Sequence, residues 1–435
     1  MRPSFQSWGR YPKAEHQVLQ LEWLTDRIPQ LGEGQSLLPY GLGRSYGDSC
    51  LNDGQTLLAT WRLNRFIEFE AATGRLRAEA GVSLADILAI AAPRGWFLPV
   101  TPGTKHVTLG GAVANDVHGK SHHVSGSFGN HVDRFELLRS DGRRLLCSPE
   151  ENPDYFAATV GGLGLTGLIT WVELRLKRVP GPWIDVEELQ FRGLDEFLAL
   201  SRESEQTHEY IVAWVDCASK GKNLARGIFS RGNHSLSKAP WVRPKPGPRM
   251  PVDLPGFALN PLSVGLFNSL YFHKQFSPRK ARTVSYEPFF YPLDAIEDWN
   301  RAYGKQGFLQ WQCVVPFENA RETMKEILTR ISASGLASFL SVMKTMGAMP
   351  PVGMLSFPAP GVTLALDFPA RHARLFPMLG ELDEIVAEAG GRLYPAKDAR
   401  MSGRHFRLFY PRHEEFKKYI DPAFSSSFWR RVMSA

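Results

Sequence analysis

The sequence predicts an α+β protein, and three observations lead to that class. The chain has 435 residues, enough for two or three domains of about 150 residues each. Strand-like and helix-like segments follow one another without the regular alternation of a parallel α/β fold. The composition also changes near Val179, where long amphipathic segments replace short strands and turns.

Short strands and few helices are predicted in the first part of the chain. Residues 66–70 and 76–80 alternate on either side of a Thr-Gly turn and predict a hairpin. A helix is predicted after Ser83, a suitable N-cap with an aspartate at the third helical position, and it should end before Pro93. Leu168, Thr170, Val172, Leu174 and Leu176 recur at every second position, which predicts a half-buried strand.

The second part predicts longer elements and one unusual loop. Residues 194–205 and 318–334 are amphipathic helices by their spacing, and residues 310–315 form a strand-like run. Residues 240–261 contain seven prolines and predict an exposed, extended loop. Its basic and apolar residues leave two interpretations open, a plain surface insertion or a lid that docks on lipid or substrate: Lys238, Trp241, Arg243, Lys245, Arg249, Phe257 and Leu262.

Composition excludes several classes of protein. Hydrophobic residues make up 43% of the chain and charged residues 22%, which excludes a disordered chain. No apolar run reaches the ~18 residues of a membrane-spanning helix, and the first residues lack the apolar core of a secretory signal. We therefore expect a cytoplasmic protein, peripheral at the membrane surface if the proline-rich loop docks there.

The net charge limits the classes of partner that we expect, and the cysteines indicate whether disulfides or zinc sites are expected. The formal charge of +7 would attract anionic partners, but no nucleic-acid-binding motif accompanies it, so nucleic acid is not expected. The four cysteines are widely spaced and predict neither a disulfide framework nor a zinc site: Cys50, Cys147, Cys217 and Cys313.

Three glycine-rich segments indicate a cofactor that carries a diphosphate, at residues 39–48, 102–111 and 160–167. Glycine lets backbone N–H groups turn inward and form a nest that binds phosphate, although any single segment could be an ordinary turn. The third segment matches G-x-G-x-x-G. A helix at 154–159 precedes it and the strand at 168–176 follows it, the reverse of the dinucleotide-binding order, so a nicotinamide cofactor is not favoured.

Residues 115–123 concentrate polar and titratable groups after the second glycine segment. His118 and His122 have the i, i+4 spacing of a helical metal site. Gly119 and the glycines that follow disfavour a helix there. Hydrogen-bonded histidines are therefore favoured over a metal site.

Four motifs carry a family resemblance: residues 41–48, 118–131, 299–304 and 394–398. Together they resemble the decaprenylphosphoryl-β-D-ribose 2′-oxidase family, flavoenzymes of the vanillyl-alcohol-oxidase type, and the similarity spans nearly the whole chain. The family oxidises the ribose hydroxyl of a polyprenyl-phosphate sugar to a ketone. A partner short-chain reductase then returns the product with inverted configuration, as an arabinan precursor for the cell wall.

The resemblance also implies a domain arrangement. It predicts a two-part PCMH-type FAD-binding domain formed by residues 1–178 and 392–435. Between these parts it predicts an α+β substrate domain, residues 179–391, with an antiparallel sheet flanked by helices.

The resemblance assigns the FAD site residue by residue. Arg44 stands where relatives with tethered flavin carry a histidine, so noncovalent FAD is expected. The implied contacts are Pro39, Tyr40, Gly41, Leu42, Gly43, Arg44, Ser45, Tyr46, Gly47, Asp48, Ser49, Gly103, Thr108, Leu109, Gly110, Gly111, Asn115, Asp116, Val117, His118, Ile169 and Tyr394.

The same resemblance implies a catalytic centre with Lys397 and His118. A lysine beside the flavin would stabilise the negative charge that hydride transfer creates. Either Lys397 or a neutral His118 could accept the hydroxyl proton, directly or through water. The implied substrate side is Tyr46, Lys120, Gln312, Lys344, Phe290 and Ala365.

Two positions depart from the family pattern. Ala365 stands where the best-known members have a pocket cysteine, and Phe290 replaces a pocket tyrosine. Both changes make the pocket less polar, which bears on the identity of the sugar more than on the reaction.

Two other functions remain open. A free-sugar alditol or aldonolactone oxidase is one, although the His-Trp-x-Lys signature of many aldonolactone oxidases is absent. A noncatalytic flavin-fold binding protein is the other, and the presence of both His118 and Lys397 argues against it.

Overall fold

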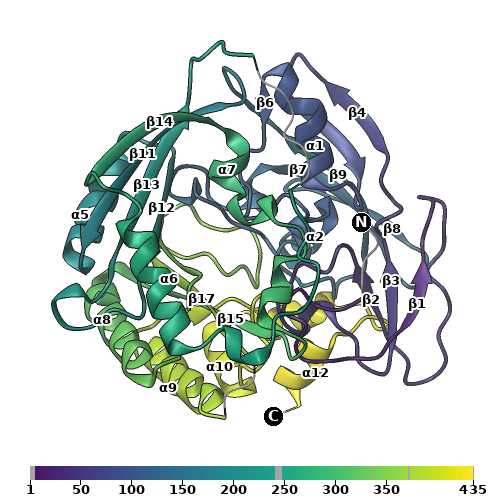
Figure 1. Cartoon of the computed structure of the whole chain (residues 1–435). Coiled ribbons are helices and arrows are strands. Elements are labelled where there is room, and N and C mark those ends of the chain that lie inside the picture. The colour runs from purple at the N-terminus through teal and green to yellow at the C-terminus, as the bar shows by residue number, and fades with distance from the viewer. Residues whose placement is uncertain (1–4, 241–246, 337, 371–372, 435) are drawn as a thin grey trace.

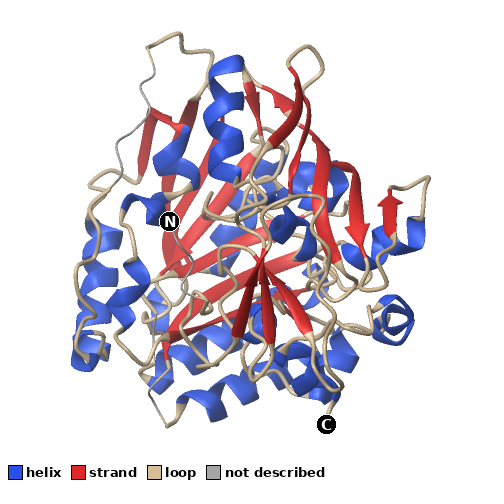
Figure 2. Ribbon diagram, turned by 90° about the vertical axis from the view of Figure 1, so that its right-hand side faces the viewer, coloured by secondary structure: helices blue, strands red, loops and turns tan. Residues whose placement is uncertain are grey.

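In the residues that the computed structural model describes, 5–240, 247–336, 338–370 and 373–434, four β-sheets with helices packed on them make up the fold. Figure 1 shows an eight-stranded sheet on one side and the sheets of the N-terminal part on the other. Figure 2 shows the strands inside and most helices along the lower rim and the margins. The predicted α+β class is confirmed.

The N-terminal part contains an antiparallel sheet of order β4-β5-β9-β7-β8. The predicted hairpin and the predicted strand at 168–176 are both confirmed within it. Its strands are β4 (Phe66–Glu70), β5 (Arg75–Glu79), β7 (Val132–Leu138), β8 (Arg144–Cys147) and β9 (Leu168–Arg175). A parallel sheet beside it contains β1 (Gln17–Gln20), β2 (Leu37–Tyr40) and β3 (Thr56–Ala59), and β6 (Trp96–Phe97) pairs with β10 (Lys177–Arg178).

Two helices of this part lie where the sequence predicts them. Helix α1 (Leu84–Ala91) starts at Ser83, whose side chain forms a capping box with Asp86, and Gly95 follows the helix in the left-handed conformation. Helix α4 (Pro153–Thr159) precedes the third glycine segment and β9 follows it. The other short helices here are α2 (Leu109–Ala114) and α3 (His122–Ser125).

The large sheet has the order β14-β11-β13-β12-β16-β17-β15-β18, and all its neighbouring strands are antiparallel. Its strands are β11 (Trp183–Arg192), β12 (Tyr210–Val215), β13 (Arg226–His234), β14 (Arg279–Ser285), β15 (Phe308–Val315), β16 (Ser341–Met346), β17 (Gly361–Pro369) and β18 (Arg392–Leu393). Strand β18 lies at the start of the C-terminal segment that the sequence assigns to the FAD domain.

One face of the large sheet is covered by helices. Helices α5 (Leu194–Glu205), α8 (Phe317–Ser334) and α9 (Leu375–Glu388) pack there, and the predicted helices at 194–205 and 318–334 are confirmed (Figure 1). Because side chains alternate along a strand, Trp311 and Cys313 of β15 lie in the core with these helices. We call the opposite side of β15, β16 and β17 the site face; it carries Gln310, Gln312, Lys344, Thr363, Ala365 and Asp367.

The proline-rich segment is anchored at its described end. Residues 241–246, which include Trp241, Arg243 and Lys245, lie outside the described residues. Asp253 pairs with Arg10 at 2.6 Å, and Arg249 pairs with Asp298 at 2.5 Å. Residues 247–260 contain a short 3-10 turn and one isolated β-bridge, and they are largely exposed, as predicted, before α6 (Pro261–His273) and α7 (Tyr286–Phe290) begin.

No helix in the described part of the chain is both long and apolar enough to cross a membrane.

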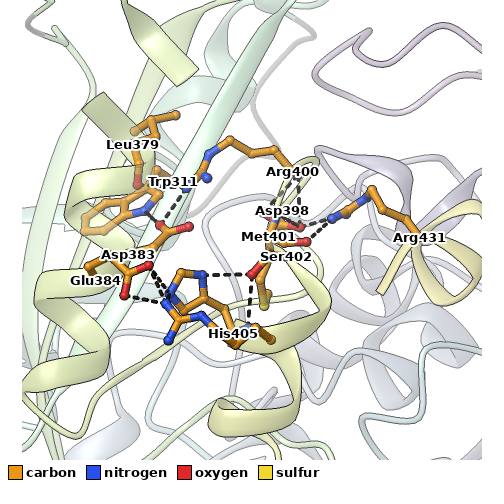
Figure 3. Close-up of polar contacts among 11 residues, drawn as sticks. Trp311, Leu379, Asp383, Glu384, Asp398, Arg400, Met401, Ser402, His405 and Arg431 are labelled. Atoms are coloured by element: carbon orange, nitrogen blue, oxygen red, sulfur yellow. Dashed lines mark hydrogen bonds and ion pairs between the residues drawn. The ribbon is translucent and has the colours of Figure 1, made fainter. Parts of the chain in front are cut away.

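The C-terminal segment returns to the N-terminal part through α10 (Gly403–Phe409), α11 (His413–Phe416) and α12 (Ser427–Met433). Arg431 of α12 binds Asp48 in the first glycine segment at 2.8 Å. It also binds Asp398 at 2.8 Å, in the segment of residues 394–398 that we call the Lys397 loop. Figure 3 shows the Asp398–Arg431 pair beside the contacts of Asp383 with Trp311 and Arg400. The last helix therefore joins two loops that are far apart in sequence.

We predict that Arg431→Ala lowers the free energy of unfolding by about 3 kcal/mol, because it leaves two buried carboxylates without their cation. Chemical denaturation followed by fluorescence measures the change. Arg404→Ala is the matched control, since Arg404 pairs with Glu384 in the same region but on the surface, where little change is expected. Equal stability of Arg431→Ala and the wild type would contradict the bridging role.

Candidate active site

The first glycine segment, the second glycine segment and the Lys397 loop meet in space. The Tyr46 N–H donates to the Ala396 carbonyl at 2.9 Å. A Cβ added to Gly47 would lie 1.6 Å from the Asp398 carbonyl oxygen, and one added to Gly41 would lie 2.3 Å from Thr108 Oγ1. Only glycine allows these close approaches.

The first segment has the donors that a diphosphate needs. Among the described residues, the N–H groups of Gly41, Leu42, Gly43 and Ser45 donate to no protein acceptor. Gly43 has a φ of +62°, which favours glycine. Consecutive free N–H groups in such a turn form an anion nest, so these residues fit a diphosphate cofactor such as FAD.

The third glycine segment has another role, which corrects the expectation of three phosphate nests. Its Gly161 and Leu163 N–H groups donate to the carbonyls of Val113 and Ala114 at 3.0 and 2.8 Å. The segment packs against the C-terminal end of α2, and these donors are already used.

Several side chains assigned to FAD are occupied by protein contacts. The Asp48 carboxylate binds Arg431, and the Tyr40 hydroxyl donates to the Gln6 carbonyl at 2.6 Å. Arg44 Nε donates to the His106 carbonyl at 3.0 Å, and its guanidinium lies 4.0 Å from the centroid of the Trp8 ring. These side chains hold the loops in place, so contacts from this part of the segment would come from its backbone.

Asp116 fixes the loop that carries His118. It is fully buried and accepts from the Gly129 N–H at 2.8 Å, from Ser127 Oγ at 2.8 Å and from Ser356 Oγ at 2.6 Å. Nearby, the Tyr394 hydroxyl donates to the Asn115 carbonyl at 2.8 Å. Tyr394 therefore ties the C-terminal loop to the residues just before His118.

The remaining assigned positions are distributed around this centre. Thr108 caps α2 by accepting from the Gly111 N–H at 3.2 Å, and Ile169 is buried in the N-terminal core. A Cβ at Gly103 would meet no atom within 4 Å, which leaves space beside that turn.

His118 is held by two residues of the site face. Lys344 Nζ lies 3.0 Å from His118 Nδ1, and Gln312 Nε2 lies 3.2 Å from His118 Nε2. Lys344 also donates to the Gly119 carbonyl. Both ring nitrogens of His118 therefore lie within hydrogen-bond distance of a side-chain nitrogen, and because a neutral imidazole has one acceptor nitrogen, it can accept at only one of them at a time.

Burial lowers the pKa values of His118, Lys344 and Lys120. Burial, then the charge of Lys344, holds the pKa of His118 well below its usual range, so the ring is neutral near pH 7. Burial and the nearby Lys120 lower the pKa of Lys344 to about 7. Burial alone lowers the pKa of Lys120 to about 8, and its Nζ donates to the Phe290 carbonyl at 3.4 Å.

Lys397 differs from the other lysines of the site. Its Nζ lies 3.8 Å from the centroid of the Tyr46 ring, and within the described residues it makes no hydrogen bond or ion pair with the protein. Burial lowers its pKa to about 8, while the charge of Asp367 acts in the opposite direction. Lys397 is thus an amine that can change protonation near neutral pH.

Asp367 is the site residue that sequence analysis missed. It is buried on the site face, Gln310 Nε2 donates to its Oδ1 at 2.5 Å, and its Oδ2 has no hydrogen-bond partner among the described residues. Burial raises its pKa to about 7, opposed by Gln310 and Lys397. The sequence does contain a signal, since Thr363, Ala365 and Asp367 alternate with apolar residues and must share one face.

The two departures from the family pattern occupy different surroundings. Ala365 is half-buried on the site face and pairs with Gln312 across the strands. Phe290 is fully buried among aromatic rings, with the centroid of Tyr210 at 4.8 Å. Cys313 follows Gln312 but faces the helix-covered core.

The histidine cluster does not form a helical metal site. Helix α3 begins at His122, so His118 lies outside it, and the two ring centroids are 6.5 Å apart. His122 Nδ1 accepts from the Gly347 N–H at 3.1 Å. The described residues contain no group of three or more His, Cys, Asp or Glu side chains that could hold a metal ion.

Comparison with known proteins identifies an FAD-binding domain and a relative that matches along almost the whole chain. The FAD binding domain family matches residues 32–148. The chain is 37% identical to the decaprenylphosphoryl-beta-D-ribose oxidase of Mycolicibacterium smegmatis over 98% of this chain and 96% of that protein. It is 32% identical to an uncharacterised protein of Streptomyces coelicolor over 81% of this chain and all of that protein.

Other relatives match a smaller share of the chain. The Delta(24)-sterol reductase of Mus musculus is 30% identical over 32% of this chain and 27% of its own length. The full-length similarity is the decisive one: the chain belongs to the decaprenylphosphoryl-beta-D-ribose oxidase family and is an FAD-dependent oxidoreductase.

Proposed function

We propose that this protein oxidises the 2′-hydroxyl of a polyprenyl-phosphoryl ribose to a ketone. The relative from Mycolicibacterium smegmatis is named for a substrate of this kind. The observation that carries the proposal is the free amine of Lys397, half-buried beside Tyr46 and next to the site face. An amine with a pKa of about 8 can take up a hydroxyl proton near neutral pH.

Bound FAD would supply the hydride acceptor, held by the backbone of residues 41–45 and the neighbouring loops. Lys397 as a neutral amine accepts the proton that leaves the hydroxyl, and it becomes a cation where negative charge develops. His118 is less suited to that task because Lys344 and Gln312 lie against its two ring nitrogens and leave neither open to the substrate. We assign His118, Lys344 and Gln312 to binding and orienting the sugar, and Lys120 and Tyr46 to the walls of the site.

The proposal extends to partners. A keto sugar on a lipid carrier needs a reductase to complete an epimerisation, so we propose a short-chain reductase as the consumer of the product. We also propose contact with the membrane surface near residues 240–261, where Val252 and Phe257 are exposed.

A free-sugar oxidase is the alternative function. Anaerobic mixing of the yellow protein with polyprenyl-phosphoryl ribose, free ribose or an aldonolactone, followed by absorbance, separates the two. Bleaching by the lipid-linked sugar alone supports the proposal, and bleaching by the free sugars alone would replace it. Absence of bleaching by any of them would indicate a noncatalytic flavin-fold protein.

We predict that acid or heat releases intact FAD from the purified protein. The reason is that the implied contacts are backbone N–H groups and that Arg44 stands at the position of a tethering histidine. Chromatography of the supernatant after precipitation identifies the flavin. Flavin that stays with the precipitated chain would contradict noncovalent binding.

We predict that Lys397→Ala and Lys397→Arg both keep FAD and both lose at least about a hundredfold in the rate of anaerobic bleaching. Arginine keeps the positive charge but stays protonated, so it cannot act as the base. In the wild type the rate should rise as pH rises through about 8, because the neutral amine is the reactive form. Stopped-flow absorbance measures these rates. Near-normal activity of Lys397→Arg would show that only the charge matters.

We predict that nitroaromatic compounds activated by the reduced flavin inhibit this protein only reversibly, and that Ala365→Cys makes the inhibition time-dependent. Position 365 lies on the site face, and a thiolate there supplies the nucleophile that alanine lacks. Intact-mass measurement after turnover decides the matter. A stoichiometric adduct on the natural protein would mean that another thiol reaches the site.

A further inference from the structure

Helix α6 exposes a row of leucines on its outer side. Leu262, Leu266 and Leu270 are 86%, 62% and 63% exposed, and their i, i+4, i+8 spacing places them on one face. Phe276, just after the helix, is fully exposed. In the described part of the chain, six large apolar side chains are more than three-fifths exposed, and five of these lie between residues 257 and 276. Such a concentration marks an interaction surface.

The opposite side of α6 fixes the helix to the protein. Val264, Asn268 and Phe272 are buried at the same spacing. Asn268 Nδ2 donates to Asp216 Oδ1 at 3.0 Å and to the Ser338 carbonyl at 3.1 Å. In the view of Figure 1, α6 runs in front of the strands of the large sheet. The leucine row is therefore presented outward on a firmly held element.

Several basic residues lie on segments next to this row. No Asp or Glu occurs from residue 254 to residue 286. Lys274 directly follows α6 and Lys280 lies in β14, while Lys220 and Lys222 lie in the loop after Asp216, which contacts Asn268 of α6. These four lysines are exposed, and within the described residues they take part in no ion pair. Arg279 and Arg282 lie close by but pair with Glu187 and Glu188.

We propose that the leucine row of α6, with Phe276 and these lysines, docks on a membrane that contains anionic lipid. An apolar helix face bordered by lysine is the composition of helices that lie in the bilayer interface, whereas protein–protein interfaces are depleted in lysine. The helix has 13 residues, about 20 Å, so it can lie on a bilayer but cannot cross it.

The position of α6 connects this docking to catalysis, and that connection rests on the proposed function. Its first turn lines a cavity with Tyr303, Phe339 and Asp367, and Asp367 belongs to the site face. A membrane that holds α6 would bring a lipid-anchored sugar to the edge of the active site.

Co-sedimentation with vesicles tests the docking without any substrate. The FAD-loaded protein should bind vesicles of equal parts phosphatidylglycerol and phosphatidylcholine more tightly than vesicles of phosphatidylcholine alone, and salt should weaken the binding. Leu266→Glu and Leu270→Glu should each weaken binding about tenfold or more. Leu408→Glu is the matched control, because Leu408 is an exposed helical leucine outside this surface, and it should bind as the wild type does.

Further variants keep the test decisive. Val252→Glu probes the proline-rich segment and should change binding less than Leu266→Glu does. If Leu266→Glu or Leu270→Glu fails to retain FAD, Leu262→Glu takes its place in the vesicle assay, because Leu262 is the most exposed residue of the row. The proposal is overturned if the wild type does not bind anionic vesicles or if the α6 variants bind them as the wild type does. It is also overturned if analytical ultracentrifugation shows a dimer that the α6 variants abolish.

A separate assay distinguishes this proposal from the proposed function. Leu266→Glu should still be bleached normally by a short-chain, water-soluble phosphoryl ribose while it loses activity on the long-chain substrate in vesicles. Vesicle binding without any bleaching would leave the docking surface intact and would refute the sugar oxidation. Equal loss with both substrates would instead show that α6 acts through the structure of the site and not through the membrane.

Discussion

The two-sidedness of β15, β16 and β17 is the constraint on which the site depends. One side of these strands is apolar and packs against α8 and α9. The other side carries glutamine, lysine, threonine and aspartate side chains that meet the His118 loop. Because side chains alternate along a strand, a one-residue shift in register would exchange the two sides. The hydrophobic core thus fixes which polar groups reach the active site.

Three lysines with little exposure to water lie together in the candidate active site, one on the site face and two on the loops around it. Lys120, Lys344 and Lys397 all have lowered pKa values, and burial is the largest cause in each case. The packed strands and loops around these lysines exclude the water that would otherwise stabilise their charge. The site therefore holds amines that can exchange protons near neutral pH, beside a cofactor cradle made of backbone. Arg431 helps to keep the Lys397 loop against that cradle.

The elements with strong local signals could be predicted from the sequence. The β4–β5 hairpin, the capped helix α1 and the strand β9 follow from alternation and capping residues. The alternation of residues 363–367 could also have identified Asp367, but a buried acid on a strand becomes significant only when its neighbours are known.

The parts that could not be predicted depend on contacts between distant segments. The third glycine segment looks like a phosphate nest, yet its donors bind carbonyls of α2. The Asp48 carboxylate is turned to Arg431, 383 residues further along the chain. Helix α6 carries apolar residues on both of its sides, so its pattern does not reveal which side is covered. Only the packing against Asp216 and Ser338 determines this.

The most direct test of the account is the isotope effect on anaerobic reduction of the bound flavin by polyprenyl-phosphoryl ribose that carries deuterium at C2′. Stopped-flow absorbance gives the rate for the labelled and the unlabelled substrate. If the site removes a hydride from C2′ while Lys397 takes the hydroxyl proton, the labelled substrate should bleach the protein several-fold more slowly. Equal rates with the C2′ label, together with slower bleaching when another ring carbon is labelled, would contradict oxidation at this position.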